Sequence, residues 1–264
     1  MATHMAPQSI LSLPVQQVAI SQQLGAFVKT YQATLKQTIG ATITFMVATL
    51  FFCGGGLLPP DLTIATRVVL VTFGLLSLAL VISMLSSIMQ TANQQIHLFQ
   101  QGMVIEKGEQ VQALPWHQAT EVWQSITRNY RNGSYVGTTY TYTLLRADGY
   151  KIKLGNLTKD IAELGPAIAQ GITRAMVPRA LHAIRTGQTL TFATFSINQQ
   201  GISHKHESLL WSQVQSIDVN QGRMTIKKIG TSRPLGTAMV AKIPNFLVFT
   251  VVAEELLRQA RGGR

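Results

Sequence analysis

Two long runs of apolar residues near the N-terminus are the strongest pattern in the sequence. The first covers residues 39–58 and the second covers residues 68–89, and neither run contains Asp, Glu, Lys or Arg. A helix of about 20 residues rises about 30 Å, which matches the hydrocarbon thickness of a bilayer. The nine residues between the runs begin with Pro59 and Pro60, which end a helix. The pattern predicts a two-helix transmembrane hairpin over residues 39–90.

A buried helical hairpin in a soluble protein is the main alternative for these two runs. Two consecutive uncharged runs of 20 and 22 residues argue against it, because soluble helices of this length alternate apolar and polar faces. A cleavable signal peptide is not expected, since the first run starts near residue 39 and no small-residue cleavage site follows it.

The N-terminal segment, residues 1–38, carries a weaker pattern. Between residues 15 and 37 apolar positions fall partly at helical spacing, and glutamines fill many of the other positions. This arrangement is compatible with an amphipathic helix that lies on the membrane surface. We therefore expect a surface helix N-terminal to the first span.

From residue 95 onward the pattern changes to that of β-strands. Asn132-Gly133 and Asp148-Gly149 are dipeptides typical of hairpin turns. The runs around them alternate or are rich in Thr and Tyr, and they predict strands over residues 95–99, 103–105, 121–127, 135–146 and 150–154.

A helix is predicted to close this first unit, which we place at residues 91–187. Apolar residues from position 161 to position 176 fall at helical spacing. A separate short linker helix is expected over residues 178–187, with Pro at its first turn and Gly beyond its end.

Residues 188–264 repeat the order of the first unit. Leu209-Leu210-Trp211 echoes Leu114-Pro115-Trp116, and a Gln-Gly dipeptide precedes the Trp in both copies. A closing helix is expected after Pro244, with Asn245 as a suitable cap. Motifs that recur in the same order indicate internal repetition. The predicted strands of this second unit cover residues 214–219, 222–229 and 236–243.

Several strands followed by one helix form the plan of a pleckstrin-homology-like (PH-like) module. The motifs Gln-Gly-(Met/Ile), Leu-x-Trp and Ile-Pro-Asn-Phe-x-x-Phe resemble an uncharacterised family of bacterial membrane proteins, over roughly residues 24–260. In that family a helical hairpin precedes PH-like modules of unknown function. The resemblance implies an α+β fold, with a two-helix transmembrane hairpin followed by two PH-like units of β-sheet and C-terminal helix. It offers no catalytic residue to carry over.

The charge of the chain is positive and unevenly placed. The sequence has 22 basic and 11 acidic residues, and 19 of the basic residues lie in residues 91–264. Near the ends of the two runs, Lys29, Lys36 and Lys107 oppose Arg67 in the loop. Because positive residues favour the cytoplasmic side, we expect a multi-pass protein of the cell membrane with both termini in the cytoplasm.

Residues for catalysis or metal binding are sparse. Cys53 is the single cysteine and lies in the first apolar run, so no disulfide within the chain is expected. His204 and His206 would share one face of a strand, but no further ligand cluster accompanies them. The acids are scattered. We expect no enzymatic activity, no catalytic residue, no metal and no cofactor.

One segment combines cationic and aromatic side chains at a predicted hairpin. Arg128, Tyr130, Arg131 and Tyr135 surround the Asn132-Gly133 turn. Tyrosine suits the headgroup level of a membrane, and the arginine fork suits phosphate oxygens. We expect these four residues to contact a membrane surface or a partner. The alternative is an exposed hairpin with stacked Arg–Tyr pairs.

These features favour a membrane-anchored, non-enzymatic binding or scaffolding protein. Its tandem basic units would meet anionic lipid headgroups of the bilayer or another membrane protein. A nucleic-acid-binding membrane protein is one alternative, which the spread of charge over two units disfavours. An accessory subunit of a membrane enzyme or transporter is another.

Overall fold

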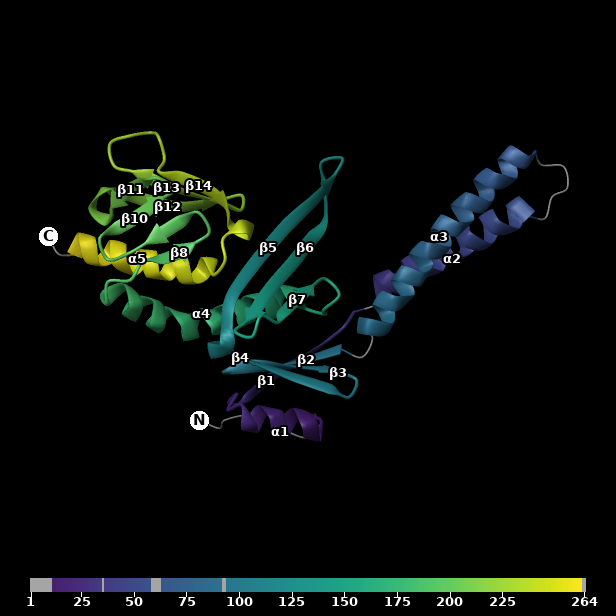
Figure 1. Cartoon of the computed structure of the whole chain (residues 1–264), viewed down its shortest axis with the longest axis horizontal. Helices are drawn as coiled ribbons and strands as arrows, with labels where there is room; N and C mark the ends of the chain where they lie inside the picture. The colour runs from purple at the N-terminus through teal and green to yellow at the C-terminus, as the bar shows by residue number, and fades with distance from the viewer. Residues whose placement is uncertain (1–10, 35, 58–62, 92–93, 263–264) are drawn as a thin grey trace.

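The computed structural model describes residues 11–34, 36–57, 63–91 and 94–262, and within them the chain has an α+β fold (Figure 1). Antiparallel sheets of four and three strands occur twice, and five α-helices accompany them in the described part of the chain. The α+β class expected from the sequence is therefore confirmed.

Helices α2 (Lys36–Leu57) and α3 (Ile64–Thr91) pack side by side and extend away from the sheets (Figure 1). A Cβ atom on Gly74 would lie 2.4 Å from Cys53 Sγ, so the contact requires glycine there. The Thr49 and Ser77 hydroxyls are 2.7 Å apart and satisfy one another between the helices.

One stretch in the described residues is long and apolar enough to cross a membrane. It is Ile64–Ser86 in α3, with 23 residues and a mean hydropathy of 2.7. The apolar stretch Ile39–Gly54 in α2 is shorter, and the loop expected at residues 59–67 lies partly outside the described residues. The structure thus supports the second predicted span by length and composition, and the first span stays a prediction.

The first four-stranded sheet contains strands that precede and follow the helical pair in the sequence. Strand β1 (Phe27–Gln32) precedes α2 and pairs antiparallel with β2 (Gln94–Phe99), which follows α3, with Tyr31 opposite Ile96. The helical pair is therefore an insertion between two neighbouring strands. Strands β3 (Gly102–Lys107) and β4 (Gln110–Pro115) complete this sheet.

The prediction of a surface helix within residues 15–37 is wrong in its extent. Helix α1 covers only Leu13–Ser21, and a turn with positive φ at Gln23 and Gly25 separates it from β1. The aromatic and β-branched residues between positions 27 and 32 gain more from pairing with β2 than from a longer helix. Val15 and Ala19 of helix α1, and Leu24 of the turn after it, then pack on the sheet against Phe99 and Val104.

A buried polar network also fastens α1 to this sheet. His97 is 1% exposed, and its Nδ1 and Nε2 lie 2.9 Å from Thr30 Oγ1 and from Glu106 Oε2. Ser12, just before α1, donates its hydroxyl to Glu106 Oε1 at 2.7 Å. Burial raises the pKa of Glu106, but the hydrogen bonds from Ser12 and His97 outweigh it and hold the pKa below its ordinary value.

The second sheet of the first unit contains β5 (Ala119–Arg131), β6 (Ser134–Arg146) and β7 (Lys151–Gly155), in that order. Helix α4 (Ile161–Arg185) lies against both sheets. Tyr31 of β1 donates its hydroxyl to Glu163 of α4 at 3.0 Å, and burial together with this bond raises the pKa of Tyr31 to about 12.

The prediction of a separate linker helix over residues 178–187 is also wrong, because helix α4 continues through these positions as far as Arg185. Pro166 and Pro178 both lie inside it, although each lacks the N–H of a helical hydrogen bond. The helix continues because its ends serve different cores. Ile168 and Ile172 are buried in the first core, and Ile184 is buried in the second. Tertiary packing thus outweighs the local cost of proline.

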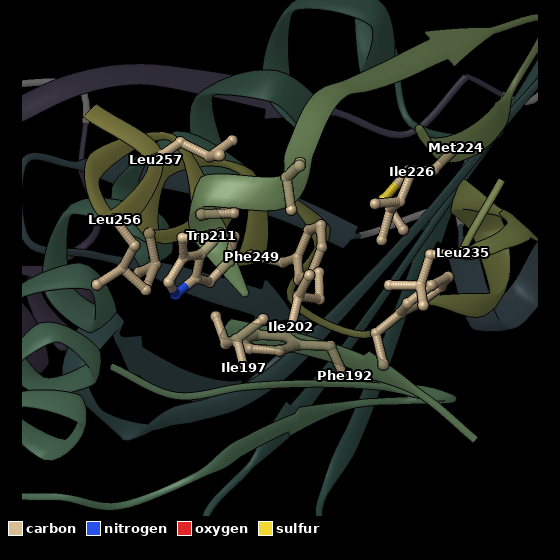
Figure 2. Close-up of a cluster of buried hydrophobic side chains, with 14 of the residues drawn as sticks. Phe192, Ile197, Ile202, Trp211, Met224, Ile226, Leu235, Phe249, Leu256 and Leu257 are labelled. Carbon is tan, nitrogen blue, oxygen red and sulfur yellow. The ribbon is translucent and has the colours of Figure 1, made fainter. Parts of the chain in front are cut away.

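The second unit repeats the sheet plan with shorter strands. Its core gathers Trp211 with side chains from the strands and the last helix (Figure 2). Phe249 and Ile197 in this core are 0% exposed. Its elements are β8 (Leu190–Phe192), β9 (Phe195–Ile197), β10 (Gly201–His204), β11 (Glu207–Leu210), β12 (Val214–Asn220), β13 (Arg223–Lys228), β14 (Gly236–Met239) and α5 (Phe246–Gly262).

The two tryptophans of the repeat occupy matching positions. Each follows a strand, begins a single 3₁₀ turn and is buried, with Trp116 3% exposed and Trp211 2% exposed. The indole N–H of Trp116 donates to the Gln100 carbonyl at 3.0 Å, and that of Trp211 donates to the Asn198 carbonyl at 2.9 Å. The same chemistry therefore fixes both turns.

The same close backbone contact explains the glycine of the Gln-Gly dipeptide in both units. A Cβ on Gly102 would lie 2.7 Å from the carbonyl oxygen of Leu114, and one on Gly201 would lie 2.2 Å from that of Leu209. Each carbonyl belongs to the strand that leads into the tryptophan turn. The motif recurs because the neighbouring backbone approaches too closely for a side chain.

Candidate functional site

Strands β5 and β6 form a two-stranded ribbon that projects beyond the rest of their sheet (Figure 1). Their pairing runs up to Arg131 opposite Ser134, whereas β7 pairs with β6 only between residues 141 and 145. Asn132 and Gly133 at the tip have φ values of +50° and +81°, as a tight hairpin turn requires. The expected Asn-Gly turn is confirmed.

The four predicted contact residues all lie on this ribbon near its tip. Tyr130 is 62% exposed and Tyr135 is 58% exposed, and they are register partners whose ring centroids lie 5.9 Å apart, edge to face. The tyrosines therefore contact one another. Among the described residues neither Arg128 nor Arg131 stacks on them, so the Arg–Tyr pairs of the alternative interpretation do not occur at this hairpin.

The two arginines of the ribbon leave their charges available. In the described part of the chain neither Arg128 nor Arg131 forms an ion pair. Both residues are exposed. A cation without a competing carboxylate can bind an anionic ligand with no internal bond to break.

A groove of about 840 Å³ separates this ribbon from the second unit. It contains Arg128 and Tyr130, while Arg131 and Tyr135 remain at the tip. The structure thus divides the four predicted residues between two places. The groove is lined by Gln124, Ser125, Ile126, Thr127, Arg128 and Tyr130 from β5, and by Val219, Gln221, Gly222, Met239, Val240, Ala241 and Phe246 from the second unit.

The lining of the groove is partly apolar and carries positive charge. Ile126 is 53% exposed, Val219 is 51% exposed and Met239 is 40% exposed. Arg128 is the single charged residue among the lining residues, and none of them is acidic. This composition suits an anionic ligand that also offers apolar groups.

Asn245 fastens the second unit to the edge of β5 just below the groove. Its Oδ1 accepts the Val122 N–H at 2.9 Å, its Nδ2 donates to the Thr120 carbonyl at 2.8 Å, and its own N–H donates to the Val122 carbonyl at 2.8 Å. The sequence suggested Asn245 as a helix cap instead. Nothing local in the sequence indicates a partner more than 120 positions away.

A second group of cations lies where the sheets meet the helical pair. Lys107 stands opposite Gln94 at the start of β2, and the Lys159 N–H donates to the Gln32 carbonyl at the end of β1. Lys153 lines a pocket of about 240 Å³ together with Gln32 and Gln94. These lysines are far apart in the sequence, so sequence reasoning did not find this cluster.

The two histidines that were considered as metal ligands, His204 and His206, do not have the arrangement that a metal site would need. Strand β10 ends at His204, and His206 follows Lys205, whose φ of +56° places it in the turn before β11. The two histidines therefore do not share a strand face, which corrects that premise. The His204 ring lies 4.7 Å from the Phe195 ring instead. No group of three or more His, Cys, Asp or Glu that could hold a metal occurs in the described ranges.

Comparison with known protein families gives one match. A family model described as a family of unknown function (DUF6585) matches residues 1–261, so the chain belongs to that family. Neither the comparison with curated proteins nor that with solved structures gives a match.

Proposed function

We propose that this member of the family is a membrane-anchored, non-enzymatic binding or scaffolding protein. Helices α2 and α3 act as a two-span anchor, and the two β-rich units are PH-like modules held at the surface of the cell membrane. The anchor places no charged residue between positions 68 and 91, which disfavours ion passage through it.

The observation that carries the proposal is the apolar surface of the helical pair. Many large apolar side chains point outward from it, among them Leu50 at 70% exposed, Phe51 at 73% and Leu76 at 60%. A contiguous apolar surface of this kind is unfavourable in water and favourable in lipid. Because β1 and β2 are neighbouring strands, the start of α2 and the end of α3 lie on the same side, next to the first sheet.

The sheet plan supports the PH-like part of the proposal. Each unit has a sheet of four strands and a sheet of three strands, followed by one helix, α4 or α5. In each unit a buried tryptophan lies between the two sheets in the chain and belongs to the core that the closing helix completes. The repetition of the whole plan suits a scaffold with two similar surfaces.

Anionic lipid headgroups are the ligand that the charges favour. Lys107, Lys153 and Lys159 lie at the base of the helical pair, where a membrane surface would pass. In Figure 1 the β5–β6 ribbon extends to the same side of the first sheet as the helical pair. Each basic residue near an anionic surface contributes about 1 kcal/mol of binding free energy.

Changing both Arg128 and Arg131 to Ala is expected to weaken binding to anionic liposomes by about 2 kcal/mol. The measurement uses a chain in which a short turn between β1 and β2 replaces residues 36–91, so that anchoring does not mask surface binding. The melting temperature should barely change, because both side chains are exposed at the ribbon.

The matched control changes Lys205 and Arg233 to Ala, which removes the same charge from exposed sites in the second unit; neither residue forms an ion pair in the described part of the chain. It should weaken liposome binding less. If the ribbon variant binds normally but melts earlier, the arginines are structural and the lipid contact is wrong. Salt-dependent binding of oligonucleotides in place of liposomes would favour the nucleic-acid alternative.

The orientation proposed has both termini in the cytoplasm, from the excess of Lys29, Lys36 and Lys107 over Arg67. A cysteine introduced at Thr63, with Cys53 replaced by Ser, should react with an impermeant thiol reagent added outside intact cells. A cysteine at Gln221 in the second unit should stay unlabelled. The reverse pattern would mean that the units face outward.

A further inference from the structure

Strand β5 is an edge strand whose outer side faces the groove. It pairs with β6 alone, and the order of its sheet is β5-β6-β7. The backbone groups on its other side are therefore available to a further strand wherever nothing else covers them.

The direction of these groups follows from two independent contacts. The Val122 N–H and carbonyl both bond to Asn245, so at this residue they point away from β6. On β6 the Tyr140 N–H bonds to Asn156 Oδ1, on the side away from β5, and Tyr140 is the register partner of Ile126. Both contacts indicate that the even-numbered residues of β5 do not exchange backbone hydrogen bonds with their register partners on β6.

The N–H and carbonyl groups of Ile126 and Arg128 therefore point into the groove. Among the described residues no hydrogen bond engages these four groups. Five consecutive residues of β5, from Gln124 to Arg128, line the groove, so it follows the edge of the strand rather than one face. The pattern changes only beyond the bulge between Asn129 and Tyr130.

The same edge already accepts backbone-like partners at its lower end. The amide side chain and N–H of Asn245 make three hydrogen bonds with residues 120 and 122, in the manner of an added strand. Above Asn245 the second unit withdraws from β5 and leaves the groove of about 840 Å³. The open part of the edge is thus a continuation of a surface that the fold itself uses for strand-like contacts.

We infer that this groove binds an extended acidic segment of another protein by adding it as a strand to the free edge of β5. Backbone bonds to Ile126 and Arg128 supply register, and Ile126, Val219 and Met239 receive alternate apolar side chains. Arg128, the one charged group of the lining, selects acidic side chains. The inference goes beyond the lipid contact proposed for the ribbon tip.

The test measures binding of a short synthetic peptide of alternating Val and Glu to the full chain in detergent micelles. The key variant is Ile126→Pro, which removes one N–H that points into the groove and leaves the bonds to β6 intact. Its affinity should fall at least tenfold. The control variant Ile126→Val keeps the N–H and a branched apolar side chain and should lose less than threefold. Arg128→Ala should lose about fivefold at low salt.

Hydrogen exchange of the unmodified chain gives a second measurement that does not depend on any variant folding. Adding the peptide should protect the amides of Ile126 and Arg128, which exchange freely without it. The amides of Ser125 and Thr127 bond to β6 and should be protected in both states.

Three results would overturn the inference: no binding of the peptide to the unmodified chain, equal binding by Ile126→Pro and the unmodified chain, or no added protection at Ile126 and Arg128. Liposome binding by the unmodified chain and by Ile126→Pro separates this failure from that of the proposed function, because Ile126 carries no charge. If the unmodified chain does not bind the peptide but still binds liposomes, the inference fails and the lipid contact stays in place.

Discussion

Replacing Trp211 by Ala is expected to destabilise the second unit by about 3–5 kcal/mol. The side chain is 2% exposed and lies among Ile197, Phe249 and Leu256 in the core (Figure 2). Its loss removes a large apolar volume and leaves the Asn198 carbonyl without the indole N–H that it accepts at 2.9 Å. Chemical denaturation followed by circular dichroism measures the change.

The equivalent change in the first unit should cost a similar amount. Trp116 is 3% exposed and packs on Gly171 of α4, where a Cβ would lie 2.5 Å from its Nε1. The control is Leu210→Ala, beside Trp211 but 52% exposed, which should change stability by less than about 1 kcal/mol. A loss below about 1 kcal/mol for either tryptophan would contradict the matching roles assigned to the two turns.

Removing residues 36–91 is expected to give a folded chain that is recovered in the soluble fraction, whereas the full chain is expected in the membrane fraction. Strands β1 and β2 are antiparallel neighbours on either side of the helical pair, with Gln32 opposite Gln95, so a short turn can join them without disturbing the sheet. The removed segment contains nearly all of the outward apolar surface of the helices. Ultracentrifugation and circular dichroism give the result.

A matched control exchanges the same segment for a soluble helical hairpin of equal length. It should behave like the deletion if the apolar surface alone holds the chain in membranes. Recovery of a folded deletion variant in the membrane fraction would mean that other surfaces anchor the protein. Aggregation of the deletion variant, with a soluble exchange variant, would show that the sheet needs a spacer between β1 and β2.

Most strands of the first unit, the hairpin turns and the tryptophan repeat could be predicted because their signals are local. The strand expected over residues 236–243 is wrong in its extent, since β14 ends at Met239 and a 3₁₀ turn follows it. Thr and Tyr alternate along β6, Asn132-Gly133 supplies the positive φ of its turn, and the glycine before each tryptophan marks a close backbone approach. Each of these patterns has one physical cause within a few residues. The structure contains all of them.

Two elements that sequence reasoning missed depend on partners far away in the chain. Strand β1 is short, and only pairing with residues 94–99, beyond the helical pair, makes it a strand. Helix α4 contains Pro178, a local stop signal, but the helix continues through that point because its residues pack in two cores. Periodicity alone cannot reveal either kind of tertiary support.

The candidate site was predicted only in part, because some of its residues are close in the sequence and others are far apart. Arg128, Tyr130, Arg131 and Tyr135 were found as a local cluster at a turn, and the structure places them on one exposed ribbon. The groove beside them is formed by residues 219–222 and 239–246, and the sequence gives no sign that these segments face β5. The lysines at the base of the helices were missed because they come from three separate segments.

Membrane anchoring by the helical pair is the central claim, and alkaline carbonate washing tests it most directly. Membranes from cells that express the full chain are washed at high pH and high salt, which strips proteins held only at the surface. The chain is expected to stay in the membrane pellet, as it should if α3 and its partner α2 are inserted in the lipid. Recovery of the full chain in the supernatant would contradict it.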